Sequence, residues 1–323
     1  MNKIVVTRRI PEEALGLLKK NGEVFVWDRD EEPIPHEVLL AEVKEAAGLF
    51  TNVGDRIDKE LIDHAPKLKV ISTMAVGYDN INVMEAASRG ISVGHTPGVL
   101  TETTADLTFA LLMAAARRVA EGSIYVRQGQ WKSWGPMLLT GQDVYGATIG
   151  IIGMGRIGEG VARRAAGFSM NVLYHNRSRR PEIEENLNAA YCSLEELLKK
   201  SDFVVLLAPG SADTRHMIGK AEFELMKRNA VFVNASRGTN VDETALYTAL
   251  ENGDIWAAGL DVFEEEPVSM ENPLLSLPNV TVLPHIGSAT IATRTKMAVM
   301  AAQNLIAGLA GEELPFQVKL NKQ

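Results

Sequence analysis

GMGRIG, residues 153–158, stands between an apolar run, TIGII, and a helical pattern, GEGVARRAAGF. Alone, a G-x-G-x-x-G sequence is a weak signal, because glycines often only mark a turn. Between a strand and a helix, the first glycine makes the tight turn, the second lets the backbone approach a pyrophosphate, and the third packs helix on strand. The positive helix end then faces the anion. We therefore predict that a dinucleotide is bound by Gly153, Met154, Gly155, Arg156, Ile157 and Gly158.

Alternating strand and helix patterns extend from this stretch in both directions. From Ala147 onward, the predicted strands are ATIGIIG, NVLYHN, DFVVLLAP, AVFVNAS, IWAAGLDVF and NVTVLPH. Each is apolar on consecutive positions, as expected for parallel strands covered on both faces. The first hundred residues alternate in the same way, from KIVVTR to ISVGH. The sequence therefore predicts an α/β protein with two doubly wound parallel sheets.

A long helical pattern separates the two series. It covers residues 101–118, TETTADLTFALLMAAARR, and Thr103 and Asp106 have the spacing of a capping box. We expect this helix to lead into the second domain. The stretch WKSWGPMLLTGQDVYG, residues 131–146, predicts an irregular connector, whose Trp131 and Trp134 suit packing or a subunit contact better than catalysis.

Composition limits the class of protein. The 323 residues suffice for about two domains. The net charge of -8 and the lack of a basic tail argue against a nucleic-acid partner. Charges follow the first apolar positions too closely for a signal peptide, and the longest apolar stretch, residues 107–116, is too short to cross a bilayer. We expect a cytoplasmic protein with no membrane partner.

The residue that follows the second strand of the later series bears on the choice of dinucleotide. Asn176 lies 23 positions after Gly153, where an acid normally accepts hydrogen bonds from the adenosine ribose. Asn176 is neutral, and the following Arg177, Ser178 and Arg179 offer charge-assisted contacts to a 2′-phosphate. This pattern favours NADP(H) and leaves NAD(H) open. The alternative interpretation is a solvated basic turn.

Three ionisable residues follow three later strands. Arg237 follows AVFVN, Glu266 follows AAGLDVF, and His285 follows NVTVLP. Ligands of open parallel sheets bind outside the carboxyl ends of the strands, so we expect these side chains to share one site. Reduction of a 2-keto acid needs a fixed cation for the substrate and an acid that protonates the nascent alkoxide. Arginine and histidine supply these functions, and Glu266, just before Pro267, suits a partner that holds the histidine.

The other histidines and the single cysteine suggest no further chemistry. His95, at the end of a predicted strand, is the one rival to His285 as proton donor. No two histidines have metal-ligand spacing, so we predict no metal site. Cys192, the only cysteine, excludes an internal disulfide.

Several motifs together resemble one known family. GMGRIG, NASRG, AGLDVFEEEP and LPHIGSAT, in this order and spacing, resemble the D-isomer-specific 2-hydroxyacid dehydrogenases, close to their glyoxylate/hydroxypyruvate reductase branch. Supporting stretches are MAVGYDNI and TPGVLTETTADLTFALLM, and the likeness covers essentially the whole chain. The resemblance implies a Rossmann NAD(P)-binding domain at residues 100–289. It also implies a discontinuous, flavodoxin-like substrate-binding domain, residues 1–99 and 290–323.

The resemblance also implies roles for individual residues. Arg237 would anchor the substrate, Glu266 would partner the histidine, and His285 would be the acid and base. Backbone amides of Val76 and Gly77 would bind the substrate carboxylate. Further residues implied to line the cofactor site are Thr104, Ala208, Pro209, Ala235, Ser236, Asp261 and Gly287.

These observations predict an oxidoreductase that transfers a hydride from NADPH to a small 2-keto acid, glyoxylate or hydroxypyruvate, to give the D-2-hydroxy acid. One alternative is a 2-ketogluconate reductase, which would use the same three residues in a roomier pocket. A different class is a dinucleotide-sensing binding protein, which has no need of an Arg-Glu-His set. The family is typically dimeric through its nucleotide domain, so we expect a homodimer with residues 131–142 at the contact.

Overall fold

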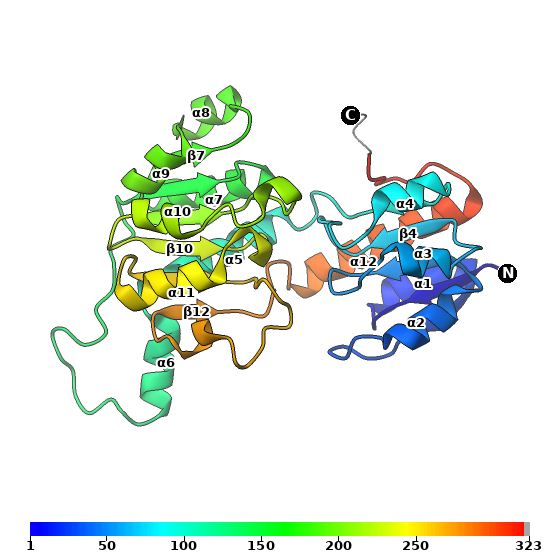
Figure 1. Ribbon diagram of the computed structural model, residues 1–323, viewed down its shortest axis with the longest axis horizontal. Helices are drawn as coiled ribbons and strands as arrows, with labels where there is room; N and C mark the ends of the chain where they lie inside the picture. Colours follow the sequence, from blue (N-terminus) through cyan, green and yellow to red (C-terminus); the bar gives the residue numbers. More distant parts are fainter. Residues whose placement is uncertain (320–323) are drawn as a thin grey trace. The chain divides into compact units, whose positions relative to one another are not determined.

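The computed structural model describes residues 1–319 and divides into two compact units (Figure 1). The first unit contains Met1–Leu100 and the described chain from Ala289 onward, and the second contains Thr101–Ser288. These boundaries differ by one residue from those expected for the two domains.

The first unit is a five-stranded parallel sheet with helices on both faces. Its strands are β1 (Lys3–Val6), β2 (Glu23–Val26), β3 (Ala46–Thr51), β4 (Val70–Thr73) and β5 (Ser92–Gly94). Their order, β2-β1-β3-β4-β5, is the flavodoxin-like one. Its helices are α1 (Glu12–Asn21), α2 (His36–Val43), α3 (Lys59–Asp63), α4 (Val83–Ser88) and α12 (Ile291–Ala310).

Alternate residues of these strands point to opposite faces and build two cores. Ile4 and Val70 pack with α1 and α12 on one face, whereas Val5 and Ile71 pack with α2, α3 and α4 on the other. The last long helix of the chain thus completes the fold that the first hundred residues begin. This return explains why the unit is discontinuous in sequence.

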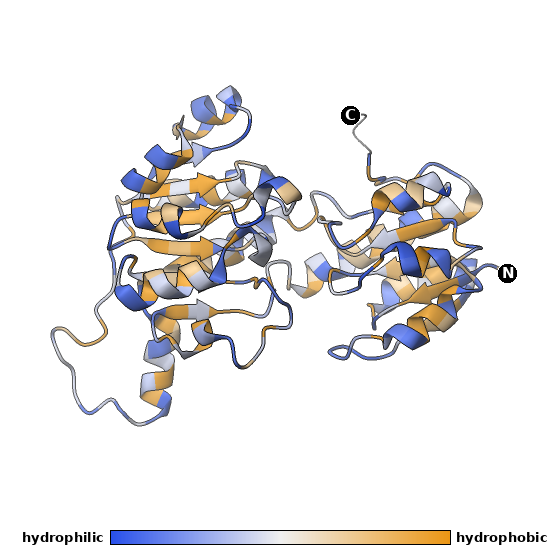
Figure 2. Ribbon diagram, viewed as in Figure 1, coloured by the Kyte–Doolittle hydropathy of each residue, from blue (hydrophilic) through white to orange (hydrophobic). Residues whose placement is uncertain are grey.

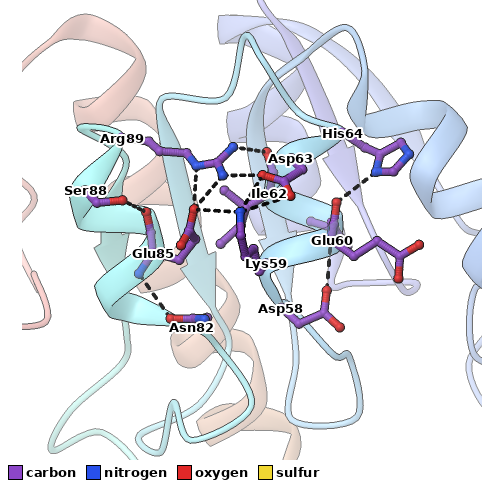
Figure 3. A network of polar contacts seen from close by, with 11 residues as sticks. Asp58, Lys59, Glu60, Ile62, Asp63, His64, Asn82, Glu85, Ser88 and Arg89 are labelled. Carbon is purple, nitrogen blue, oxygen red and sulfur yellow. Dashed lines mark hydrogen bonds and ion pairs between the residues drawn. The ribbon is translucent and has the colours of Figure 1, made fainter.

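A surface network of ion pairs joins α3 to α4 (Figure 3). Arg89 contacts Asp63 and lies 2.5 Å from Glu85, and Lys59 lies 3.1 Å from Asp63 and 3.6 Å from Glu85. Exposed pairs of this kind typically contribute up to about 1 kcal/mol each. The network keeps the two helices side by side at little gain in overall stability.

The second unit contains a seven-stranded parallel sheet. Its strands are β6 (Thr148–Ile152), β7 (Asn171–His175), β8 (Ala189–Tyr191), β9 (Phe203–Leu206), β10 (Val231–Asn234), β11 (Ala257–Leu260) and β12 (Val280–Val282). The order β12-β11-β10-β9-β6-β7-β8 is the Rossmann order with a seventh strand added. Figure 2 shows the central strands as almost continuously hydrophobic, as burial on both faces requires.

This unit also contains helices, most of which cover the two faces of its sheet. They are α5 (Thr101–Ala116), α6 (Val119–Arg127), α7 (Arg156–Gly167), α8 (Pro181–Leu187), α9 (Leu194–Lys200), α10 (Lys220–Leu225) and α11 (Glu243–Asn252). Single 3-10 turns are η1 (Ala212–Thr214), η2 (Gly238–Asn240) and η3 (Pro273–Ser276). Helices α5 and α7 pack on one face, and α9, α10 and α11 pack on the other.

The structure contradicts the expected capping box of α5. The helix already begins at Thr101, so Thr103 and Asp106 lie inside it and form no capping box. Asp106 instead makes an ion pair of 2.5 Å with Arg164 of α7. A tertiary ion pair therefore uses the acid that the sequence pattern assigned to a local cap.

The segment after α5 is α6 followed by a connector without regular structure, which projects from the second unit in Figure 1. Trp134 and Tyr145 in this connector are 78% and 75% exposed. Helix α6 buries none of its residues and was not predicted.

Among residues 1–319, no helix is long and apolar enough to cross a membrane. The same residues contain no group of three or more His, Cys, Asp or Glu that could hold a metal ion. Cys192 directly follows β8 and is buried, and burial raises the pKa of its thiol.

Candidate active site

Arg237, Glu266 and His285 lie on loops that follow the neighbouring strands β10, β11 and β12. Because these strands are parallel, the three loops emerge at one edge of the sheet. His285 Nδ1 lies 2.6 Å from Glu266 Oε2. The second unit thus brings together the acid and the histidine that the sequence predicts as partners.

The hydrogen bonds of Glu266 define the protonation of this pair. Its Oε1 accepts the N–H of Phe263 at 3.0 Å, while Oε2 faces His285. Partial burial raises the pKa of Glu266, but the hydrogen bond and charge of His285, the Phe263 N–H and the charge of Arg237 outweigh it, so the pKa lies below its ordinary value. An ionised carboxylate only accepts, so Nδ1 carries the proton. The Nε2 edge of the ring is left for a substrate.

The backbone of His285 is strained. Its φ of +52° lies in the left-handed region, which non-glycine residues seldom adopt. Asp261 holds this loop, because its two carboxylate oxygens accept the N–H groups of Ile286 at 2.8 Å and Gly287 at 2.9 Å. Asp261 is only 2% exposed, and burial raises its pKa. Thr104 of α5 lies beside Gly287.

Arg237 is positioned by its own loop and by a glycine. Buried Asn234 accepts from the N–H and Oγ of Ser236, at 3.1 and 2.9 Å, and donates to the Arg237 carbonyl at 2.9 Å. Gly238 lies directly against the next loop, since a Cβ added there would be 1.8 Å from the Phe263 carbonyl carbon. This close approach brings the arginine loop against the loop that carries Glu266.

The glycine-rich turn has the geometry that a pyrophosphate needs. Gly153 has a φ of +99°, and its Cβ would be 2.6 Å from the backbone nitrogen of Ala208. A Cβ on Gly158 would be 2.5 Å from the Gly153 carbonyl oxygen. Gly155 is different, because nothing lies within 4 Å of its Cβ position. The turn is therefore closed where it packs and open in front of the N-terminus of α7, where the residues fit a dinucleotide phosphate.

The loop after β7 differs from the expected cluster of free arginines. Arg179 is bound to Glu184 through two contacts of 2.7 and 2.6 Å. Arg180 contacts Glu182. Of the arginines that follow Asn176, Arg177 is exposed and, among residues 1–319, makes no ion pair. Acids of α8 thus neutralise Arg179, which was expected to contact the 2′-phosphate, and its neighbour Arg180.

The other predicted residues occupy loops after neighbouring strands. Ala208 and Pro209 follow β9, which lies between β6 and β10 in the sheet, and Ala235 and Ser236 follow β10. Val76 and Gly77 belong to the first unit, in the loop after β4.

Sequence reasoning missed residues that hold these loops. Asn240, fully buried, donates to the Ala208 carbonyl at 2.9 Å. Glu243, the first residue of α11, accepts the N–H of Glu264 at 2.6 Å, beside the Glu266 turn. Only Asn234, which also holds one of these loops, could have been found from the sequence. It ends the apolar strand VFVN, and a buried amide needs hydrogen-bond partners.

Comparisons with known proteins identify the family of this chain. Residues 109–287 match a sequence profile described as D-isomer specific 2-hydroxyacid dehydrogenase, NAD binding domain. The chain is 52% identical to a glyoxylate reductase of Korarchaeum cryptofilum, over 97% of this chain and 94% of that protein. It is 51% identical to a glyoxylate reductase of Pyrococcus horikoshii, over 98% and 95%.

Solved structures give the same assignment. An NADPH-dependent glyoxylate/hydroxypyruvate reductase of Sinorhizobium meliloti, determined with NADP and malonate, superimposes with a TM-score of 0.86 at 34% identity, covering 98% of this chain and 96% of that one. A glyoxylate reductase of Paecilomyes thermophila gives a TM-score of 0.85 at 34% identity, covering 98% of both chains. The chain belongs to the D-isomer-specific 2-hydroxyacid dehydrogenase family.

Proposed function

We propose that the protein is a reductase that uses NADPH to convert glyoxylate, hydroxypyruvate or a closely related 2-keto acid into the D-2-hydroxy acid. The observation that carries the proposal is the 2.6 Å pair of His285 and Glu266 on the loop edge that also carries Arg237 and the glycine-rich turn. The names of the relatives favour the same substrates.

Three side chains share the chemistry. When bound, the dinucleotide supplies the hydride that adds to the carbonyl carbon of the substrate. His285 Nε2 donates its proton to the carbonyl oxygen, which becomes the new hydroxyl. Ionised Glu266 holds the ring through Nδ1 and stabilises its protonated form. Arg237 stabilises negative charge on the carbonyl oxygen and the carboxylate.

We propose that the loop after β4 contributes to binding of the substrate carboxylate. Val76 and Gly77, in the loop after β4, would donate their backbone N–H groups to the carboxylate. On this proposal, residues 1–99 and 290–323 form the substrate-binding domain, of which residues 320–323 lie outside the part of the chain that the structure describes, and residues 100–289 form the dinucleotide-binding domain.

The preference for NADPH rests on Asn176, Arg177 and Ser178. Asn176 brings no negative charge to repel a 2′-phosphate, and its side chain donates to the Ser178 carbonyl at 3.2 Å, which orders the turn. Arg177→Ala should raise KM for NADPH about tenfold or more and leave KM for NADH unchanged, because a charge-assisted phosphate contact is lost. Arg179→Ala is the matched control, since Glu184 already engages that guanidinium. Equal effects on both cofactors would contradict the assignment.

Initial rates test the function directly. We would measure NADPH and NADH oxidation with glyoxylate, hydroxypyruvate and 2-ketogluconate, for the wild type and for His285→Ala. Turnover of the small 2-keto acids that His285→Ala abolishes, with cofactor binding retained, supports the proposal. A strong preference for 2-ketogluconate would reassign the substrate, and tight cofactor binding without turnover would favour a sensor.

We further propose a homodimer formed through the second unit. Its exposed apolar side chains gather on α6 and the connector, at Val119, Ile124, Val126, Trp131, Trp134 and Met137. Exposed apolar side chains in this number mark protein contacts. Sedimentation of the wild type as a dimer and of Trp134→Ser as a weaker dimer would support this contact, whereas a monomeric wild type would exclude it.

A further inference from the structure

His95, the alternative proton donor in the sequence analysis, lies beside the loop of Val76 and Gly77, which we propose binds the substrate carboxylate. His95 directly follows β5, and its Nδ1 lies 2.9 Å from the carbonyl oxygen of Val76. A carbonyl oxygen only accepts, so Nδ1 carries the proton and donates it. The Val76 carbonyl and the Gly77 N–H belong to the same planar peptide unit. The ring of His95 therefore fixes the plane in which the Gly77 N–H points.

The loop is anchored on both sides of this peptide. Before it, Met74 donates to Thr51 at 2.9 Å and Ala75 accepts from Thr96 at 2.8 Å, all through the backbone. After it, the side chain of Asn80 donates to carbonyl oxygens of the loop that follows β3. Within residues 1–319, the backbone N–H groups of Val76 and Gly77 donate to no protein acceptor. Two adjacent donors are thus left for a ligand, and His95 supplies the hydrogen bond that orients the second of them, the Gly77 N–H.

His95 is itself held firmly enough to act as a support. Its backbone N–H donates to the Phe316 carbonyl at 3.0 Å. Its carbonyl accepts from Asn304 of α12 at 3.1 Å, and Asn304 is fully buried. The edge of the ring packs against Tyr78, with the centroids 5.5 Å apart and the planes at 85°. The residue links the C-terminal helix to the loop of Val76 and Gly77.

We propose that His95 is a positioning residue for the substrate carboxylate. Its Nδ1–H fixes the plane of the Val76–Gly77 peptide and polarises it, so that the Gly77 N–H becomes a better aligned and stronger donor. Hydrogen bonds in a chain strengthen one another by roughly 10–30%. This inference rests on the proposed function, in which that loop binds the carboxylate of a 2-keto acid.

Substitutions at His95 separate the hydrogen bond from the shape of the ring. His95→Phe keeps a ring against Tyr78 and removes the donor. In His95→Asn, the side-chain nitrogen occupies nearly the place of Nδ1, so the bond to Val76 can form. In His95→Gln, the nitrogen reaches the place of Nε2 instead. The matched control is His64→Phe, because His64 Nδ1 bonds to the Glu60 carbonyl at 2.8 Å at the end of α3, away from the loop (Figure 3).

The readouts are kcat and KM for glyoxylate, the inhibition constant of oxamate (an unreactive carboxylate of similar shape) and the Kd of NADPH. For His95→Phe and His95→Gln, we expect KM and the oxamate constant to rise about fivefold, because the Gly77 N–H loses its alignment and with it the value of about one ordinary hydrogen bond. The carboxylate is bound alike in ground and transition states, so kcat should stay within about twofold. His95→Asn and His64→Phe should resemble the wild type, and NADPH binding should not change in any variant.

Three results would overturn the inference: an unchanged KM in both His95→Phe and His95→Gln, an equal defect in His95→Asn, or a loss confined to kcat. If His95→Phe does not fold, the contrast between the Asn and Gln variants still decides the question. A wild type that neither reduces glyoxylate nor binds oxamate would overturn the proposed function and this inference with it. If the wild type is active but KM for glyoxylate is unchanged in His95→Phe and His95→Gln, only the inference about His95 is overturned.

Discussion

Gly238→Ala tests whether the close approach of two loops assembles the active site. The change adds one methyl group next to Arg237. In the wild type, that position lies 1.8 Å from the carbonyl carbon and 1.9 Å from the carbonyl oxygen of Phe263. Phe263 also donates its N–H to Glu266, the partner of His285. The methyl group therefore pushes directly between the arginine and the acid-histidine pair.

The size of the effect follows from the distances. Carbon atoms in ordinary contact lie about 3.5 Å apart, so the two loops must separate by about 1.7 Å. A displacement of about 1 Å within a catalytic group can cost about 100-fold in rate. We therefore expect kcat/KM for glyoxylate to fall at least about 100-fold. Overpacking should also lower the free energy of unfolding by about 1–3 kcal/mol.

The assay combines steady-state rates with fluorescence titration of NADPH and thermal unfolding. The Kd of NADPH should change much less than kcat/KM, because the glycine-rich turn lies on a different strand end and only Ala235 and Ser236 of the cofactor site share the displaced loop. Gly167→Ala is the control, since Gly167 ends α7 and nothing lies within 4 Å of its Cβ position. A Gly238→Ala protein with the wild-type kcat/KM would show that the approach of these loops does not set the catalytic geometry.

Three further substitutions probe other parts of the second unit. Gly155→Ala should leave thermal stability unchanged, because nothing lies within 4 Å of the added methyl group, and should raise the Kd of NADPH about tenfold or more; an unchanged Kd would place the pyrophosphate elsewhere. Glu266→Gln should lower kcat/KM about 10- to 100-fold by removing a charged hydrogen bond. Because the pKa of Glu266 lies below its usual 4.5, the defect should persist at about pH 5.5, and its disappearance there would contradict the assignment. Glu184 has a pKa lowered from 4.5 to about 2 by Arg179 and Tyr174, so its stabilising effect is present above pH 4.5 and is lost as the pH falls toward 2. The difference in urea midpoint between wild type and Glu184→Gln should therefore be largest near pH 7 and shrink at about pH 3; a constant difference would show that the carboxylate charge is not its source.

Much of the fold could be predicted because buried parallel strands have an unambiguous pattern. Runs such as TIGII and FVVL are apolar on consecutive positions, and the structure forms β6 and β9 from them. The short strand β8, AAY, has two exposed residues among its three and carries no such pattern. Helix α6 begins after Arg118, which has a φ of +52° and gives no side-chain cap, so the start of this helix is not marked in sequence.

The residues of the candidate site could be predicted for a topological reason, whereas their supports could not. Side chains just after parallel strands share one edge, so Arg237, Glu266 and His285 were predicted from their positions together with the chemistry of their side chains. Their supports depend on which loops face each other across the sheet. No spacing in the sequence connects Gly238 with Phe263. The pairing of Arg179 with Glu184 could likewise not be predicted, because it depends on the position of α8.

The buried side chains that hold these loops differ energetically from the surface ion pairs. Exposed pairs such as those between α3 and α4 can open at little cost, since water replaces each partner. Asp261 and Asn234 are nearly fully buried, and their partners are backbone groups of the loops that carry His285 and Arg237. If either loop moved, a buried polar group would lose its partner, at about 1–3 kcal/mol or more for a carboxylate. That penalty is comparable with the strain of the left-handed backbone at His285, of the order of 1–3 kcal/mol. The buried carboxylate of Asp261 can therefore hold the histidine in a conformation that its own backbone disfavours.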